Sequence, residues 1–298
     1  MKSFTAGHIS SDEAKGLLAT AQENVSDARL EFIPGVSYRN LLMLRPTADS
    51  PAPFSTETRA TPPHDLTDKS VAEDFPRGPG SDMLADLMRQ SHQWFESHDV
   101  NKSRAADSKP VATNVWLWGL GQKPNLAPFS EIHGVNGAMI TAVDLLRGLA
   151  ALVGWDRIEV PGATGYTDTD YAAKGRYAIE ALAKYDLVCV HVEAPDESSH
   201  EGDCGKKVTS LEEIDEKIVG PVLKHLEDSG EEFRVLVTPD HPTYISTKTH
   251  THGDVPFAIC GAGIEADGSS DYNENSAAAS GLAMPNGWEL MPFFIGGK

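Results

Sequence analysis

Two clusters of side chains in the 298-residue sequence are of the types that ligate metals. The first holds Asp196 and His200, directly after Pro195, a residue well suited to open a helix. Residues i and i+4 lie on one face of a helix, so this carboxylate and this imidazole could bind the same ion. The second cluster begins with adjacent Asp240 and His241, which an irregular loop would direct to two sides of an ion.

Two further imidazoles, His250 and His252, follow in the second cluster. Carboxylates and imidazoles together form a ligand set for Zn, Mn or Fe. The two clusters offer more ligands than one ion needs, which favours a two-metal site of the kind that handles phosphoryl oxygens. One of the two histidines is expected to be spare, because alternate residues of an extended segment face the same side but lie too far apart for both to be well placed.

Both clusters follow predicted strands in a region where strands and helices alternate. Such alternation predicts an α/β fold with a parallel sheet and helices on its faces. Ligands of open α/β sheets bind outside the carboxyl ends of the strands, which is where both clusters come. The expected strands are 157–160, 186–192, 233–238 and 255–260, and the expected helices are 138–153, 170–184 and 211–229.

The pattern of the N-terminal part of the sequence predicts a smaller α/β unit. Its segment 46–79 is rich in Pro, Thr, Asp and Ser and has no hydrophobic period, so it is expected to be a long loop. We therefore predict two domains, 1–125 and 126–298. The expected elements of the first are helices at 11–24 and 81–97 and strands at 29–34, 38–45 and 114–121.

Composition excludes several classes of protein. Hydrophobic residues make up 40% and charged residues 23%, as in globular proteins, and 25 Lys and Arg face 44 Asp and Glu, a net charge of −19. Such a charge repels nucleic acid and anionic membranes, so neither is an expected partner. Three cysteines without a CxxC pair argue against a disulfide scaffold and fit a reducing compartment. With no apolar stretch of signal-peptide type at its start, the chain is expected in the cytoplasm.

Several motifs resemble those of one known family. HVEAPDESSHEGD, TPDHPT and THTHGDVPF, with FTAGHIS and PGVSYRNLL, closely resemble the archaeal-type 2,3-bisphosphoglycerate-independent phosphoglycerate mutases of the alkaline-phosphatase-like metalloenzyme superfamily. The resemblance covers essentially the whole chain. It implies a three-layer α/β core with a smaller α/β substrate domain, and two divalent metal ions (Mn, Zn or Mg). It also implies interconversion of 3-phosphoglycerate and 2-phosphoglycerate in glycolysis and gluconeogenesis through a phosphoserine.

The same resemblance implies roles for individual ligands. His250 is preferred to His252, because the family has a His at a set distance before Val-Pro-Phe. Carried over by motif, one metal is bound by Asp196, His200 and His250 and the second by Asp240 and His241.

The substrate side requires cations, since a phosphomonoester carries roughly −1.5 to −2 charge at neutral pH. Arg suits this task because its planar guanidinium binds oxyanions with two hydrogen bonds. In the family that the chain resembles, the stretches FTAGHIS, SYRN and NKSR belong to the substrate domain. Each charged side chain in them could also be an ordinary solvent-exposed residue. The expected substrate-binding residues are His8, Arg39, Lys102 and Arg104.

One departure from the family pattern lies at the front. Family members begin with a strand that carries an Asp ligand in a DGMAD-like motif, followed by a turn with the nucleophilic Ser, and neither is found in this sequence. Ser81 in GPGSDM is interpreted as a helix cap, so no catalytic nucleophile is identified. We therefore expect a core that is incomplete at its N-terminus and lacks a central strand, and poor activity of this chain alone.

Three other functions remain open at this point, and the sequence does not indicate an oligomeric state. They are a related phosphotransferase with another substrate such as homoserine, a metal-dependent phosphatase that uses water, and a non-catalytic metal-binding fragment.

Overall fold

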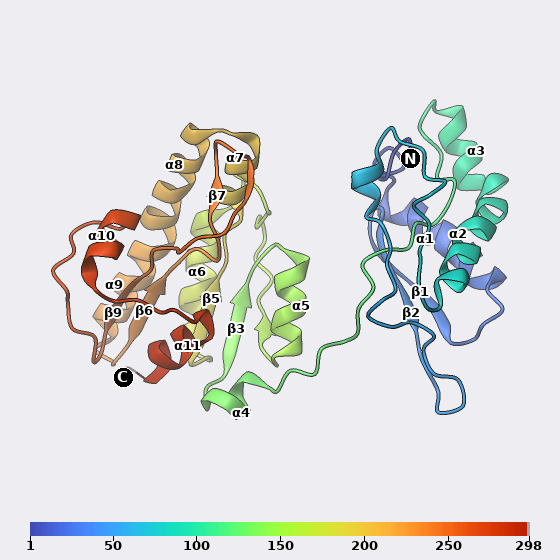
Figure 1. Ribbon diagram of the computed structural model, residues 1–298. Coiled ribbons are helices and arrows are strands. Elements are labelled where there is room, and N and C mark those ends of the chain that lie inside the picture. The colour runs from blue at the N-terminus through green and yellow to red at the C-terminus, as the bar shows by residue number, and fades with distance from the viewer. Residues whose placement is uncertain (297–298) are drawn as a thin grey trace. The chain divides into compact units, whose positions relative to one another are not determined.

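The chain divides into two compact units, Met1–Lys123 and Pro124–Lys298. The computed structural model describes residues 1–296, and Figure 1 shows each unit as helices packed on strands. Within residues 1–296, every helix is too short or too polar to span a bilayer.

The first unit is built on a β-hairpin covered by helices. Its strands β1 and β2 are antiparallel, with Leu30 opposite Leu44, and α1 packs on β1. A capping box starts α1, because the Ser10 hydroxyl accepts from the backbone of Glu13 while the Glu13 carboxylate accepts from that of Ser10. The elements of this unit are α1 (Ser11–Asn24), β1 (Leu30–Val36), β2 (Arg39–Leu44), the 3₁₀ turn η1 (Pro63–Leu66), α2 (Ser81–Glu96) and α3 (Asp99–Ala106).

The segment 114–121, expected to be a strand, forms none, and within the described residues it joins no sheet. The hairpin stops at two strands, and this segment is bound instead to groups of other elements. The amide of Val115 donates to the Ser91 hydroxyl of α2, and the Trp116 indole donates to the carbonyl of Thr61. Val115 and Trp116 are therefore held by single hydrogen bonds, while Trp118 and Leu120 are exposed.

The second unit is α/β. Its parallel sheet has the order β4-β3-β5, with Ile140 of β3 beside Val190 of β5. The connection through α5 moves one way across the sheet, from β3 to β4, and the connection through α6 moves back the other way, from β4 to β5. Because both crossovers are expected to be right-handed, α5 and α6 lie on opposite faces of the sheet. The result is a three-layer arrangement, as expected. The elements up to this point are α4 (Phe129–His133), β3 (Gly137–Ile140), α5 (Asp144–Leu152), β4 (Asp156–Arg157), α6 (Tyr171–Leu182) and β5 (Leu187–Val190).

The prediction of a helix over 138–153 is wrong for its first turn, because these residues form β3. Ala138 and Ile140 are both fully buried between the neighbouring strands. Pairing with two strands therefore overrides the helical apolar period of this segment. The helix itself begins at Asp144.

The rest of the unit contains one long helical segment and a second pair of strands. The segment α8, η2 and α9 runs without a break through a π-helical stretch, and Gly175 of α6 touches it so closely that a Cβ there would clash with the carbonyl of Lys217. The elements are α7 (Ala194–Glu201), α8 (Cys204–Ile214), η2 (Asp215–Val219), α9 (Gly220–Ser229), β6 (Arg234–Val237), β7 (Thr243–Tyr244), β8 (Thr249–His250), β9 (Ala258–Gly261), α10 (Glu274–Ser280) and α11 (Gly287–Gly296).

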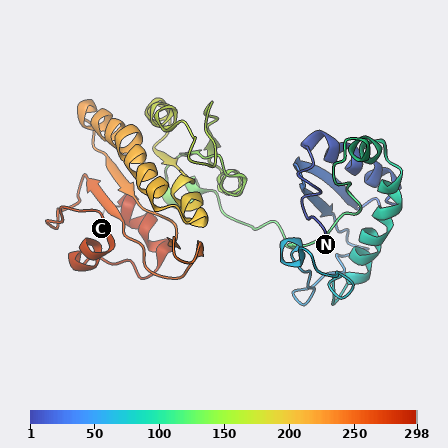
Figure 2. The same cartoon turned by 90° about the horizontal axis from the view of Figure 1, so that it is seen from above.

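The sheet of the second unit is interrupted between β5 and β6. Within residues 1–296, β6 pairs only with β9, antiparallel, and these two strands form a separate sheet. Figure 1 shows β6 and β9 on one side of β5 and β3 on the other, and Figure 2 shows the same two groups of strands from above. An interrupted sheet agrees with the expectation of an incomplete core.

Candidate metal centre

The first ligand pair stands on α7, which begins directly after β5. Pro195 lies in the first turn of α7, where its missing N–H leaves no hydrogen bond unmade. Asp196 and His200 are one turn apart on this helix, and their side chains meet, with 3.1 Å between Nε2 and Oδ2. The helix thus presents both ligands on one face, as the spacing predicts.

The second cluster is folded back onto the first by a short hairpin. β7 and β8 pair antiparallel with Thr243 opposite His250, so the chain leaves the end of β6, turns, and returns. His250 Nε2 lies 3.3 Å from Asp196 Oδ1 and 3.1 Å from His200 Nε2. The structure therefore brings together Asp196, His200 and His250, whose candidate ligand atoms all lie within 4.8 Å of one another.

Asp240 and His241 lie beside this group. The His241 ring contacts that of His250, tilted by 41° with 4.0 Å between centroids, and its Nε2 is 3.4 Å from Asp240 Oδ2. Thr243 links the two clusters, because its hydroxyl donates to Asp196 and lies 3.2 Å from His241 Nδ1. The exposed His252 lies outside this group, which contains His250.

The charges around Asp196 favour its ionised form. Burial raises the pKa of this carboxyl, but the Thr243 hydroxyl and the imidazoles of His200 and His250 outweigh burial and lower the pKa below its usual value. An ionised carboxylate with two imidazoles at these separations is a suitable donor set for one divalent ion.

A partly buried hydrogen-bonded network lies at the end of β5, beside the candidate ligands. His191 Nε2 is 3.2 Å from Glu193, and its Nδ1 is 3.1 Å from the Thr141 hydroxyl. Lys174 of α6 is 1% exposed and donates to the carbonyl of His191; desolvation lowers the pKa of this lysine to about 8. Burial also raises the pKa of Glu193, and the nearby carboxylates add to this effect. A lysine in an apolar helix face carries no sequence signal that it will be buried.

The predicted substrate residues lie in the first unit. Exposed His8 lies in a turn with φ +53°, and exposed Arg39 packs over Tyr38 at 5.5 Å. Phe4 contacts the ring of Tyr38 at 5.6 Å, so the structure brings FTAGHIS and SYRN together. Exposed Lys102 is paired with Asp99 at 2.7 Å.

Arg104, by contrast, is buried and bound to other residues of the first unit. The side chain is 3% exposed and forms a 2.8 Å ion pair with Glu13, the residue that caps α1. Its guanidinium also donates to the carbonyls of Ala6 and Gly7, in the turn that carries His8, and to that of Pro110. Arg104 therefore holds the turn in place and does not present a free guanidinium to a ligand.

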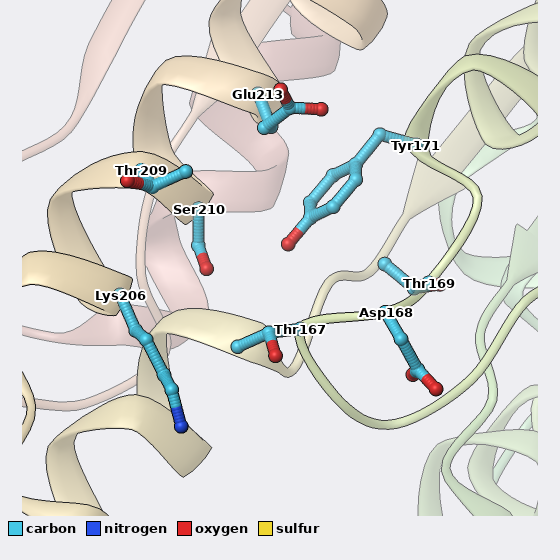
Figure 3. Close-up of a pocket in the computed structure, with 8 residues that line it drawn as sticks. All are labelled: Thr167, Asp168, Thr169, Tyr171, Lys206, Thr209, Ser210 and Glu213. Atoms are coloured by element: carbon cyan, nitrogen blue, oxygen red, sulfur yellow. The ribbon is translucent and has the colours of Figure 1, made fainter.

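A polar cavity of about 390 Å³ lies between the loop before α6 and the helix α8. Figure 3 shows the hydroxyls of Tyr171 and Ser210 directed into it. Lys206 at its edge forms an ion pair with Glu201, the residue next to the candidate ligand His200. This ion pair connects the edge of the cavity to the end of α7.

Comparison with known proteins identifies the family. The profile of the metalloenzyme superfamily matches residues 7–295. A 2,3-bisphosphoglycerate-independent phosphoglycerate mutase from Methanosarcina barkeri is 43% identical over 100% of this chain and 74% of its own length. A protein from Geobacter sulfurreducens, named as a probable enzyme of the same kind, is 39% identical over 99% of this chain and 72% of its own. The chain belongs to the cofactor-independent phosphoglycerate mutase family of the metalloenzyme superfamily.

Solved structures agree on the fold of this mutase family. A protein from Pyrococcus horikoshii superposes with a TM-score of 0.77 at 25% identity, over 97% of this chain and 70% of its own. The cofactor-independent phosphoglycerate mutase from Thermoplasma acidophilum has a TM-score of 0.62 at 20% identity, over 96% and 70%. Membership of a metalloenzyme superfamily implies divalent metal binding, and the group of Asp196, His200 and His250 has the donor chemistry for it.

Proposed function

We propose that this chain serves in the cofactor-independent interconversion of 3-phosphoglycerate and 2-phosphoglycerate, in glycolysis and gluconeogenesis. The observation that carries the proposal is the convergence of the two ligand clusters, from α7 and from the β7–β8 hairpin, beside the carboxyl ends of β5 and β6. Relatives 39–43% identical over nearly the whole chain bear the name of this enzyme, which supports it further.

Two divalent ions, Mn, Zn or Mg, are proposed as the cofactors. Asp196, His200 and His250 would hold one ion, and Asp240 and His241 would contribute to the second. When bound, such ions neutralise the charge of a phosphoryl group and lower the pKa of an attacking hydroxyl.

The chain's own residues would bind and orient the substrate. His8, Arg39 and Lys102 are the exposed groups proposed to contact the phosphoglycerate. Arg104 would act by holding the turn of His8 through the carbonyls of Ala6 and Gly7. A small anionic substrate of glycolysis also fits action in the cytoplasm.

The serines of α7 are not suited to be the phosphoryl acceptor. Ser198 and Ser199 are fully buried, and their hydroxyls donate to the carbonyls of Ala194 and Pro195. The proposal therefore assigns metal and substrate binding to this chain and gives neither of these two serines the role of phosphoryl acceptor.

Calorimetric titration with Mn²⁺, Zn²⁺ and Mg²⁺, followed by 3-phosphoglycerate, tests the proposal. We expect metal binding that Asp196→Asn weakens by at least roughly tenfold, and metal-dependent binding of 3-phosphoglycerate. A protein that binds metal but prefers homoserine, or that releases phosphate from a generic phosphomonoester, would support one of the alternatives instead. Equal metal affinity of Asp196→Asn and wild type would remove the basis of the assignment.

A further inference from the structure

The polar cavity of about 390 Å³ beside α8 is separate from the candidate metal ligands. Among residues 1–296, none of those ligands lines it. Its volume falls within the roughly 300–1,000 Å³ that is usual for small-molecule sites. The loop 167–169, the first turn of α6 and one face of α8 form its lining, and Figure 3 shows their side chains around a common space. The cavity therefore has room for a small molecule.

Ser210 places a buried hydroxyl in this cavity. It lies inside α8 and is 2% exposed. The buried serines of α7, Ser198 and Ser199, donate to carbonyls one turn back, as serines inside helices often do. Within residues 1–296 the Ser210 hydroxyl forms no such bond, and Figure 3 shows it directed into the cavity. Its oxygen is thus open to a molecule in that space.

Tyr171 brings a second hydroxyl to the same space. The residue is 5% exposed, and its ring is held by Ala194 of α7 and Ile218 of η2. Its hydroxyl also points into the cavity, and within the described part of the chain it has no hydrogen-bond partner. Buried hydroxyls nearly always have a partner. Two that face one space without a protein partner require one that enters from outside.

The charges around the cavity argue against an anionic ligand. Among the lining residues that the structure describes, the only cation is Lys206, and Glu201 already neutralises it at 2.7 Å. Two carboxylates, Asp168 and Glu213, also line the cavity, and Glu213 is paired with Lys217. A phosphate or carboxylate group would therefore find no unpaired positive charge here. This separates the cavity from any site for the phosphoglycerate.

The buried part of the lining is uncharged. Its members, Thr169, Tyr171 and Ser210, all carry hydroxyls, whereas Asp168 is exposed and its charge is screened by water and salt. A hydroxyl can both donate and accept, so the groups that match it best are hydroxyls of the ligand. The Tyr171 side chain adds an apolar ring beside its polar tip, a surface that suits C–H groups.

We propose that this cavity binds an uncharged polyol of the size of a monosaccharide. The hydroxyls of Tyr171 and Ser210 would bond to hydroxyls of the ligand, and the Tyr171 ring would cover its C–H groups. The site is distinct from the candidate metal centre. The proposal does not depend on the proposed reaction.

A titration of the 298-residue protein with D-glucose, D-ribose and myo-inositol, followed by amide chemical shifts, tests it. We expect at least one of them to give saturable shifts at residues 167–171 and 206–213, with a Kd of about 1 mM or tighter, as is usual for ligands of this size. Inorganic phosphate and putrescine, titrated in the same way, should leave these amides unchanged.

Two variants that remove single hydroxyls sharpen the test. Tyr171→Phe and Ser210→Ala should each weaken binding of that polyol by roughly three- to tenfold. Neither should lower the urea midpoint of unfolding, because neither hydroxyl is bonded within the described residues. Tyr185→Phe is the matched control, since the Tyr185 hydroxyl bonds to Asp156 outside the cavity, and it should keep wild-type affinity.

Four results would overturn the proposal. Absence of saturable shifts with all three polyols would mean that water alone satisfies these hydroxyls. Shifts at the same amides with phosphate or putrescine but not with polyols would assign a charged ligand. Unchanged affinity of both Tyr171→Phe and Ser210→Ala would place the polyol elsewhere. A lower urea midpoint of these two variants would mean that their hydroxyls are bonded inside the protein. Because metal and phosphoglycerate are left out, failure here leaves the proposed function untouched.

Discussion

The two units differ in how they fill their interiors. Among residues 1–296, the first unit buries thirteen hydrophobic side chains, of which three are alanines, and the second buries ten, of which six are alanines. The second unit is nevertheless the longer one. Hydrophobic stabilisation scales with the apolar area removed from water, so the first unit has the more self-sufficient core. The unit with the candidate metal centre has the smaller apolar core.

The largest expected difference between the units comes from their cores. Phe95→Ala in the first unit should lower the free energy of unfolding by roughly 3–5 kcal/mol, because Phe95 is 2% exposed and packs against α1. Val188→Ala on half-buried β5 should cost much less, about 1 kcal/mol. Urea denaturation, monitored by hydrogen exchange in each unit, measures the loss of unfolding free energy in both variants. Equal losses would contradict the difference between the two cores.

Lys174 gives the second unit a particular pH dependence. Its pKa of about 8 in the folded state lies below the ordinary 10.5, so the unfolded chain binds the proton more tightly. The cost of burying the charge is fully present below pH 8, and stability should rise between pH 8 and 10.5, by up to roughly 2–3 kcal/mol. Urea unfolding at pH 7.5, 9 and 10 should show this rise in wild type and not in Lys174→Met. The same change of unfolding free energy with pH in wild type and in Lys174→Met would contradict this role of Lys174.

Metal should stabilise the second unit and leave the first unchanged. At a free concentration one hundred times the Kd, binding adds roughly 2.7 kcal/mol to the free energy of unfolding. His250→Ala should abolish most of this gain, and His252→Ala, an exposed residue outside the group, should keep it. Thermal denaturation with and without Mn²⁺ or Zn²⁺ measures the effect. A gain that survives in His250→Ala would place the ion elsewhere.

Arg104 tests the self-sufficiency of the first unit. Arg104→Met removes charged hydrogen bonds to Glu13 and to the turn of His8, and should cost roughly 1.5–3 kcal/mol even without substrate. Lys102→Ala, at an exposed ion pair, should change stability by less than about 0.5 kcal/mol. Should Arg104→Met weaken 3-phosphoglycerate binding with no loss of stability, a direct contact would replace the positioning role.

Local sequence patterns were enough to predict most elements near the metal centre. Pro195 opens α7, and the spacing of Asp196 and His200 places both on one helix face. By contrast, 138–140 has a helical period but forms a strand, because neighbouring strands bury it on two edges. The segment 114–121 reads as a strand, but the Val115 amide and the Trp116 indole donate to Ser91 and Thr61 and not to a neighbouring strand. Pairing partners distant in sequence decided both outcomes.

The sequence by itself determined the types of ligand and their order along the chain. Side-chain chemistry and helical periodicity are local properties, so the carboxylates and imidazoles could be named from it. Only the tertiary structure decided that the β7–β8 hairpin returns His250 to Asp196, that Arg104 is buried against Glu13, and that the sheet is open between β5 and β6. These outcomes depend on contacts between residues up to 91 positions apart, which no local pattern encodes.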